Sequence, residues 1–246
     1  MPTYVITGAR GGIGLEYVNQ LSKDRSATTV ALVRDISADL TSLNAIKAAS
    51  KGAVHILECD ISSEASISAL TDRVAGVLGS DDAKIDVLIN NAALLQLPQQ
   101  DVLTLEEEAL SAHMRSNVLG PARTLQALLP FFRDTSATGH TVVVNITSGA
   151  GSLGWVTNGV CPHALTPYAV SKAGLNMLTV HQAKQLRDRG VVVVAVDPGH
   201  VKTEAGGPGA TVEVEDSAGG ILRLLDGLKV EDSGRFFLYN GTEVPW

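Results

Sequence analysis

The chain has 246 residues, of which 45% are hydrophobic and 18% charged, and its formal net charge is -7. This composition is typical of a globular protein with a full hydrophobic core, and it excludes a disordered chain. A nucleic-acid surface needs a basic stripe, so the acidic balance argues against a nucleic-acid partner. The two cysteines, Cys59 and Cys161, cannot form a disulfide framework, which favours a reducing compartment.

The sequence predicts neither export nor a membrane span. The first residues lack a basic stretch followed by an apolar core, so no signal peptide is expected. The longest purely apolar run, residues 191–196, is too short to cross a bilayer. We therefore expect a cytoplasmic protein without a membrane partner.

Seven apolar runs of strand length recur along the chain, at residues 4–7, 28–33, 54–58, 86–90, 141–147, 191–196 and 236–239. They are rich in β-branched residues and do not alternate with polar ones, which is typical of strands buried on both faces. Helix-length segments lie between them, for example at residues 13–24, 63–78, 105–132 and 168–189. This alternation predicts right-handed βαβ units, a parallel sheet and a single domain over residues 1–246.

The first apolar run is followed by a glycine-rich turn, TGARGGIG, at residues 7–14. It lacks the lysine of a P-loop, and Tyr17 stands where G-x-G-x-x-G would need its third glycine. It fits T-G-x-x-x-G-x-G, in which the absent side chains let the backbone approach a pyrophosphate at a helix N-terminus. A turn of this composition can also serve only the packing of strand against helix.

Tyr168 and Lys172 are four residues apart in a predicted helix and therefore share one face. A nearby ammonium is expected to lower the pKa of a tyrosine, which is ordinarily about 10. Such a tyrosine can give a proton to a carbonyl oxygen while hydride reaches the carbon. In isolation, the same pair would be an ordinary helical tyrosine and a solvated lysine.

Five motifs occur in order: TGxxxGxG, NNA at 90–92, NITS at 145–148, YAVSK at 168–172 and DPG at 197–199. As a set they resemble the short-chain dehydrogenase/reductase superfamily over nearly the whole chain. LVRD, SNVLGP and the final FFLYNGTEVPW resemble the fungal polyketide ketoreductases and sniffer-type carbonyl reductases within it. The resemblance implies an α/β fold, a Rossmann-type three-layer sandwich with a seven-stranded, mostly parallel sheet.

The resemblance also implies four catalytic residues: Asn117, Ser148, Tyr168 and Lys172. Ser148 would hydrogen-bond the substrate carbonyl, and Tyr168 would be the general acid in reduction. Lys172 would tune Tyr168 and hold the nicotinamide ribose. Asn117 would position a water in a proton relay, although a polar residue in a helix can simply bond locally.

The end of the second strand bears on the cofactor. An acidic residue there suits NADH, whereas an arginine suits the 2′-phosphate of NADPH. Arg34 precedes Asp35 at this point, and Arg10 lies in the glycine turn, so NADPH is expected in preference to NADH. The residues expected at the cofactor are Gly8, Arg10, Gly12, Ile13, Gly14, Arg34, Asp60, Ile61, Asn90, Ala92, Tyr168, Lys172, Pro198, Gly199, Val201 and Thr203.

Residues 135–171 contain no Asp, Glu, Lys or Arg. Ser148 precedes Tyr168 by 20 residues, a longer gap than is common in the family, and residues 155–162 fill it. We expect an irregular loop that forms a lip over the substrate and carries Trp155; an insertion folded away from the pocket is the alternative. Cys161 in this loop is expected to be an inert thiol.

His200 follows the PG dipeptide, where family members often have an aromatic or apolar residue. It is either a polar group near the substrate or a packed ring, and we expect packing. The glycine-rich segment 204–213 is expected to be a flap.

The leading hypothesis is NADPH-dependent reduction of a ketone, apolar or aromatic and possibly polyketide-derived, by a homodimer or homotetramer without a metal. The alternatives are a non-redox cyclase or isomerase and a nucleotide-binding regulatory protein on the same fold.

Overall fold

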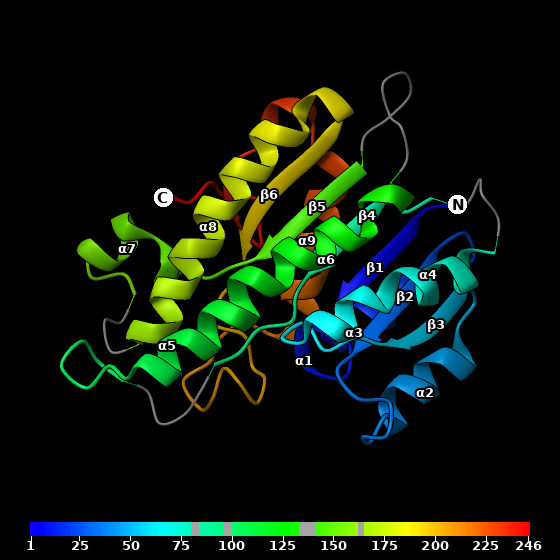
Figure 1. Cartoon of the computed structure of the whole chain (residues 1–246), viewed down its shortest axis with the longest axis horizontal. Helices are drawn as coiled ribbons and strands as arrows, with labels where there is room; N and C mark the ends of the chain where they lie inside the picture. The colour runs from blue at the N-terminus through cyan, green and yellow to red at the C-terminus, as the bar shows by residue number, and fades with distance from the viewer. Residues whose placement is uncertain (80–83, 96–99, 133–140, 162–164) are drawn as a thin grey trace.

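The computed structural model describes residues 1–79, 84–95, 100–132, 141–161 and 165–246. Its seven-stranded sheet has the order β3-β2-β1-β4-β5-β6-β7, and each neighbouring pair is parallel (Figure 1). The strands are β1 (Thr3–Thr7), β2 (Thr28–Val33), β3 (Ala53–Glu58), β4 (Val87–Asn90), β5 (Thr141–Ile146), β6 (Val191–Asp197) and β7 (Phe236–Leu238). The expected α/β fold is confirmed, and its sheet is parallel throughout.

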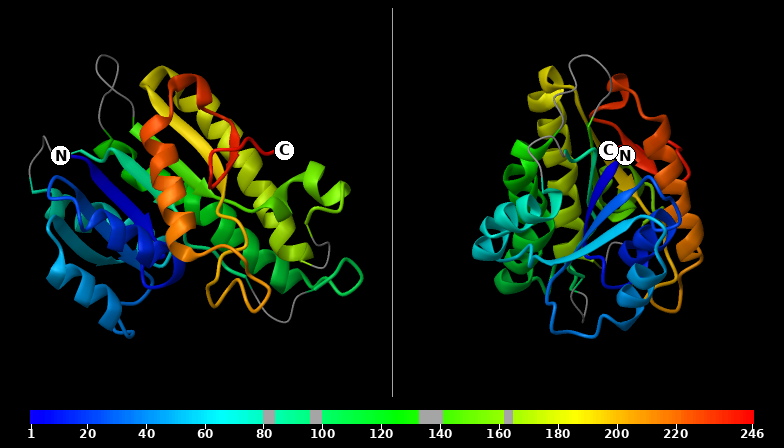
Figure 2. Two further views of the ribbon diagram at one scale, coloured as in Figure 1. Left: turned by 180° about the vertical axis from the view of Figure 1, so that it is seen from behind. Right: turned by 90° about the vertical axis from the view of Figure 1, so that its right-hand side faces the viewer.

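Helices cover both faces of the sheet (Figure 2). One face carries α1 (Gly12–Leu21), α2 (Thr41–Ala49) and α9 (Val214–Gly227). The other carries α3 (Glu64–Ser68), α4 (Leu70–Leu78), α5 (Glu107–Met114), α6 (Gly120–Leu128) and α8 (Thr166–Leu186). Short turns of 3-10 helix lie at Leu129–Phe131, Gly149–Gly151, Arg187–Arg189 and Val230–Asp232.

The core consists of a hydrophobic layer on each side of the sheet. Every residue of β4, β5 and β6 is buried, which explains why these strands show no polar alternation. Side chains of alternate strand residues enter opposite layers, so Val143 and Val193 meet α8 while Val144 and Val194 meet the layer of α1 and α9.

Two predicted helices are interrupted. The segment 63–78 contains α3 and α4, and Ser63 caps α3 by accepting the Ser66 N–H. The segment 105–132 contains a π-helical turn, η1 (Arg115–Leu119), between α5 and α6. Pro121, in the first turn of α6, lacks the N–H that an uninterrupted α-helix would need there. Each of these two segments was expected to form one uninterrupted helix.

Candidate active site

The motif residues gather at the carboxyl ends of the central strands. The glycine turn follows β1, NNA begins at the end of β4, Ser148 lies just after β5, and the PG dipeptide follows β6 (Figure 1). Because parallel strands end at one edge of the sheet, these segments from distant parts of the chain share one side of the molecule. The sheet thus places all four strand-end motifs at one edge.

The glycine turn packs tightly against NNA. A Cβ at Gly8 would lie 2.9 Å from Ala92 Cα, and one at Gly14 would lie 2.3 Å from the Gly8 carbonyl oxygen. Gly8 also has a φ of 71°, which disfavours any side chain. These two glycines therefore allow the close packing of the turn against NNA and against itself.

Gly12 and the start of α1 have room for a ligand. Gly12 has a φ of 54°, and its Cβ would face the Thr203 side chain at 3.3 Å. Among the described residues, no side chain caps α1 and nothing lies within 4 Å of a Cβ at Gly11. The first N–H groups of the helix can therefore donate hydrogen bonds to an anion such as a pyrophosphate.

Arg10 and Arg34 converge on the end of β2. Both are exposed, and both help to hold the pKa of Asp35 below its ordinary value, after the larger effect of hydrogen bonds from Ser37. The Asp35 carboxylate accepts the Ser37 N–H at 2.8 Å and its hydroxyl at 2.6 Å. The Asp35 carboxylate thus accepts hydrogen bonds within its own turn, and the charges of both guanidinium groups act on it.

The remaining residues that were expected on the adenosine side differ in the groups that they expose. Asp60 accepts the Ser62 N–H and hydroxyl through Oδ1, and Ile61 packs against Gly120 at the start of α6. The Asn90 side chain points into the interior and donates to Asn145 Oδ1 at 2.9 Å. Asn90 can therefore face a cofactor only through its backbone.

Asn91 was missed by the sequence analysis. Its Nδ2 donates to the Thr7 carbonyl at 3.0 Å, while its N–H and that of Ala92 donate to Thr7 Oγ1. These bonds tie the NNA segment to the end of β1. Asn91 lies between Asn90 and Ala92, which were both expected at the cofactor, and this position could have indicated it.

Tyr168, Lys172 and Ser148 come together at the start of α8. The Tyr168 and Ser148 hydroxyls are hydrogen-bonded. Lys172 Nζ lies 5.5 Å from the Tyr168 ring centroid and donates to the Ile146 carbonyl at 2.8 Å. Lys172 is only 1% exposed, because helix α8 presses its side chain onto the end of β5.

The expected lowering of the Tyr168 pKa is wrong for this structure. Burial raises the pKa of Tyr168 to about 12, and the Ser148 hydrogen bond offsets only part of this rise. Burial also lowers the pKa of Lys172 to about 7, although Asp197 acts in the opposite direction. A lysine that is only partly charged near neutrality stabilises the phenolate little, so Tyr168 stays protonated.

Asn117 lies in the π-helical turn. Its Oδ1 accepts the Leu94 N–H at 2.7 Å, and its Nδ2 donates to the Leu94 carbonyl and to Ser171 Oγ, both at 2.9 Å. Ser171 in turn donates to the Tyr168 carbonyl at 2.7 Å. The π-helical turn thus places the Asn117 side chain between the segment after β4 and helix α8. Turns of this kind are frequent at functional sites. Its role in a proton relay stays a prediction.

The PG turn and the following segment form a connected unit. Gly199 has a φ of 79° and packs against Val212 and Tyr239, and Ser217 donates to the Pro198 carbonyl. Val201 is buried and forms a β-bridge with Val212. Thr203 Oγ1 accepts the Gly206 N–H at 3.2 Å.

The packed ring expected for His200 is wrong. The residue is exposed, and its Nε2 lies 2.7 Å from the Gly206 carbonyl oxygen. The ring therefore contacts the first turn of the segment 204–213, and the role of this segment as a flap stays a prediction.

The region after Ser148 is more regular than expected. It contains helix α7 (Leu153–Thr157), whose Trp155 N–H is capped by the Ser152 hydroxyl. The Trp155 ring packs over Gly149, where a Cβ would lie 2.5 Å from Trp155 Cε3. Pro162, the end of the expected lip, lies outside the described residues. Trp155 therefore braces the Ser148 loop, and direct contact with substrate stays a prediction.

Cys161 fits the inert-thiol interpretation. A Cβ at Gly149 would lie 2.8 Å from its Sγ, so the thiol packs beside the Ser148 loop. Burial, and secondly the Asp197 carboxylate, raise the pKa of Cys161. A raised pKa disfavours the thiolate that nucleophilic chemistry needs.

His113 is a further residue that the sequence analysis missed. It is 2% exposed on α5, and its ring meets the Tyr168 ring edge-on at a centroid distance of 6.4 Å. This contact helps to fix the orientation of Tyr168. The contact crosses between two helices that are distant in sequence, so no local pattern reveals it.

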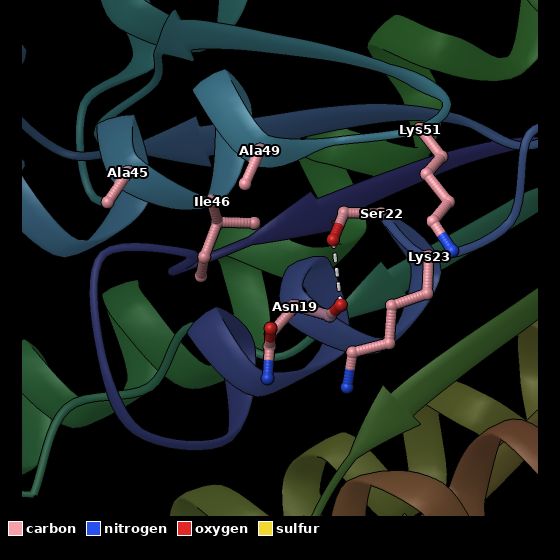
Figure 3. A pocket seen from close by; sticks show the side chains of 7 residues that line it. All are labelled: Asn19, Ser22, Lys23, Ala45, Ile46, Ala49 and Lys51. Atoms are coloured by element: carbon pink, nitrogen blue, oxygen red, sulfur yellow. Dashed lines mark hydrogen bonds between the residues drawn. The ribbon is translucent and has the colours of Figure 1, made fainter.

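A separate cavity of 280 Å³ lies away from these residues (Figure 3). The last turn of α1, helix α2 and the segment before β3 surround it, at the opposite edge of the sheet. Its lining consists of Asn19, Ser22, Lys23, Ala45, Ile46, Ala49 and Lys51. None of the motif residues reaches it.

The described part of the chain contains neither a candidate metal site nor a candidate membrane span. No cluster of three or more His, Cys, Asp or Glu side chains there could hold a metal ion. No helix there is both long enough and apolar enough to cross a membrane.

Comparison with known proteins identifies the family. Residues 2–210 match the family described as short chain dehydrogenase. The C-signal of Myxococcus xanthus is 42% identical over 164 residues, which cover 66% of this chain and 93% of that protein. Fungal short-chain dehydrogenases are also among the relatives, as the resemblance predicted.

Solved structures share the whole fold. The NADPH-bound carbonyl reductase from chicken fatty liver is 29% identical with a TM-score of 0.90, over 100% of this chain and 99% of that one. The carbonyl reductase Sniffer of D. melanogaster is 25% identical with a TM-score of 0.89, over 100% of both chains. Because the family match spans most of the sequence and these relatives share its complete architecture, this protein belongs to the short-chain dehydrogenase family of oxidoreductases.

Proposed function

We propose that the protein reduces a ketone to an alcohol with NADPH. The observation that carries this proposal is the meeting of Ser148, Tyr168 and Lys172 at the same edge of the sheet as the glycine turn. Hydroxyl donors of this kind suit a carbonyl oxygen on which negative charge develops. The carbonyl reductases among the structural relatives support the same reaction class.

In the proposed reaction, the substrate oxygen lies between the Ser148 and Tyr168 hydroxyls. Ser148 donates a hydrogen bond that stabilises the developing alkoxide, and Tyr168 transfers its proton to the oxygen. Bound NADPH supplies the hydride. The raised pKa of Tyr168, about 12, keeps this proton in place near neutrality and favours the reductive direction.

The test of this role is Tyr168→Phe. We expect turnover of any accepted ketone to fall by about 10² to 10⁴-fold, while NADPH affinity stays close to that of the wild type. Tyr4→Phe, a tyrosine near the amino end of β1 and away from the carboxyl edge of the sheet, serves as the matched control and should retain activity. Wild-type kcat in Tyr168→Phe would refute the assignment.

The proposed cofactor site combines the uncapped start of α1 with the arginines beside Asp35. Gly12, Ile13 and Gly14 would hold the pyrophosphate, and Arg10 and Arg34 the 2′-phosphate. NADPH or NADP in related structures supports this choice. The adenine would lie at Asp60 and Ile61, and the nicotinamide at Pro198, Gly199, Val201 and Thr203.

Binding measurements test the cofactor choice. Fluorescence titration should give tighter binding of NADPH than of NADH, and Arg34→Asp should abolish the difference. Arg189→Lys, at the far end of α8, is the control. Equal affinities in the wild type would contradict the proposal.

For the substrate, we propose an apolar or aromatic ketone, such as a polyketide-derived one. The support is the uncharged segment after Ser148, with the exposed side chains Leu153 and Val160 and with Trp155, which packs over Gly149. A panel of aromatic and small polar ketones tests this choice, since preference for the polar members would contradict it.

A second candidate is a regulatory protein that binds the nucleotide without turnover. It is favoured by one relative, the C-signal, whose name describes a signal. Assays of NADPH oxidation with ketones and quinones separate the two functions. Binding of NADPH without turnover would favour regulation, and conversion of substrate without net NADPH consumption would favour a cyclase or isomerase.

We also propose a homodimer or homotetramer in the cytoplasm. Exposed apolar side chains follow the outer surface of η1 and α8, at Leu119, Val170, Met177 and Val180. Sedimentation should give a dimer or tetramer, and Met177→Glu should shift it toward a monomer. Cell fractionation tests the location.

A further inference from the structure

Asp197 is a buried carboxylate that the proposed reaction does not use. It ends β6, is 7% exposed, and stands one residue beyond Val196, the strand partner of Ile146. A carboxylate in such a place costs stability unless hydrogen bonds and neighbouring charges satisfy it. Its contacts therefore indicate its purpose.

Both carboxylate oxygens accept backbone hydrogen bonds from the active-site loops. Oδ2 accepts the N–H of Gly149, the residue after Ser148, at 2.8 Å. Oδ1 accepts the N–H of Gly199 in the PG turn, also at 2.8 Å. The ionised form offers acceptors to both donors, so one side chain joins the Ser148 loop to the turn expected beside the nicotinamide.

The same carboxylate interacts with the catalytic helix. Its charge acts on Lys172 and Tyr168 from α8, and on Cys161 from the segment after α7. Lys172 donates to the Ile146 carbonyl, so its ammonium lies at the end of the strand next to β6. These three groups are the titratable neighbours on which the charge of Asp197 acts.

We propose that Asp197 is a positioning residue for the ketone reduction, which fixes Ser148 relative to the PG turn and keeps a negative charge beside Tyr168 and Lys172. This inference rests on the proposed function. The carboxylate contributes through two hydrogen bonds and one charge, and these contributions can be separated by substitution.

The direction of the electrostatic effect follows from the charges. The Asp197 carboxylate raises the pKa of both Lys172 and Tyr168, after the larger effect of burial on each. Reduction requires that Tyr168 and Lys172 carry their protons. Activity therefore falls as the pH rises through the range in which the two groups lose them. Removal of the negative charge lowers the pKa of both groups and therefore moves the alkaline limb of the profile to lower pH.

The first experiment compares the pH dependence of kcat in the wild type, Asp197→Asn and Asp197→Glu. We expect Asp197→Asn to move the alkaline limb down by about one pH unit, a change of about 1.4 kcal/mol. Asp197→Glu keeps the charge, so its limb should stay in place even if kcat falls. Asp188→Asn removes an exposed carboxylate after α8 and should change neither the alkaline limb nor kcat.

The second experiment does not depend on activity. An asparagine can accept through only one oxygen, so either Gly149 or Gly199 loses its partner in Asp197→Asn. Amide hydrogen exchange should then speed up by about 10-fold at one of the two glycines. If the wild type turns over no substrate, the proposed function fails while this measurement still tests the positioning.

An unchanged alkaline limb in an active Asp197→Asn would overturn the proposed effect of the Asp197 charge on Tyr168 and Lys172. Unchanged amide exchange at both Gly149 and Gly199 would overturn the proposed positioning role. If Asp197→Asn does not fold, Asp197→Ser, with a smaller hydroxyl acceptor and no charge, replaces it in both experiments. A purely structural residue would lower kcat in these variants without moving the limb.

Discussion

At the scale of single residues, burial decides the proton affinities of the site. Tyr168 and Lys172 share a helical face as their spacing predicted, but α8 buries Lys172 fully against the end of β5, while Tyr168 is half-buried and contacts His113 of α5. Burial penalises the charged form of each group, so the tyrosine pKa rises and the lysine pKa falls. Both shifts favour the uncharged form of each group, and the burial of these polar groups costs stability.

That cost gives a prediction for Lys172→Met. Methionine fills a similar volume without a charge, so the variant should lose activity by about 100-fold or more and yet unfold at a higher temperature. The lost hydrogen bond to Ile146 offsets about 1 kcal/mol of the gain. Calorimetry and initial-rate assays measure the two effects.

The stability gained in Lys172→Met should depend on pH. The pKa of Lys172 is lowered to about 7 in the fold, so its buried ammonium destabilises the protein fully below pH 7. This penalty disappears as the pH rises toward the unfolded value of about 10.4. The Met variant should therefore gain most below pH 7 and little near pH 10. Lys184→Met, an exposed lysine of the same helix, should show no such trend.

At the scale of elements, the loop after β5 depends on close packing around Gly149. Its N–H bonds Asp197, the Trp155 ring covers its α-carbon, and α7 is itself bonded to the last residues of the chain. Ser152 donates to the Pro245 carbonyl at 2.6 Å, and the Gly154 N–H to the Trp246 carbonyl at 3.0 Å. Three separate parts of the chain thus hold Ser148 in place.

Gly149→Ala tests this arrangement. The added methyl group would lie 2.5 Å from Trp155 Cε3 and 2.8 Å from Cys161 Sγ, so the loop must shift. We expect a loss of about 1–3 kcal/mol in stability and a lower kcat, because Ser148 is the adjacent residue. Denaturant unfolding and initial rates measure both.

Two further variants make the interpretation specific. Gly76→Ala lies in exposed α4, where no described atom is within 4 Å of the new Cβ, and should be neutral or stabilise by up to about 1 kcal/mol. Adding Trp155→Leu to Gly149→Ala should restore part of the lost activity, since the shorter side chain gives room. Additive losses in the double variant would contradict the packing explanation.

At the scale of the whole molecule, one continuous sheet positions the loops of the candidate site. The glycine turn follows β1, and the loops of Ser148 and of the PG dipeptide follow β5 and β6 in the same sheet. The prediction of a single domain is tested by calorimetry, which should show one transition with equal calorimetric and van't Hoff enthalpies.

NADPH should move this whole transition. At a concentration 100 times its Kd, a ligand that binds only the native state stabilises it by about 2.7 kcal/mol, or about 5–10 °C for a chain of this size. Two transitions, of which only one responds, would indicate separate domains. Arg34→Asp should reduce the shift with NADPH but not with NADH.

Much of the fold and part of the candidate site follow from sequence because their signals are local. The buried runs predicted all seven strands, the TGxxxGxG spacing predicted a glycine turn between a strand and a helix, and YxxxK predicted a shared helical face. Each of these patterns reflects backbone geometry within a few residues, which the sequence carries directly.

Other properties were decided only by the tertiary structure. The pKa values of Tyr168 and Lys172, the edge-on contact of His113 and the two bonds of Asp197 all join segments that are distant along the chain. Burial depends on what packs over a side chain, and a spacing motif contains no information about that. The sequence by itself determined which groups reach the carboxyl edge of the sheet, while packing determined their proton affinities, because desolvation is a property of the assembled fold.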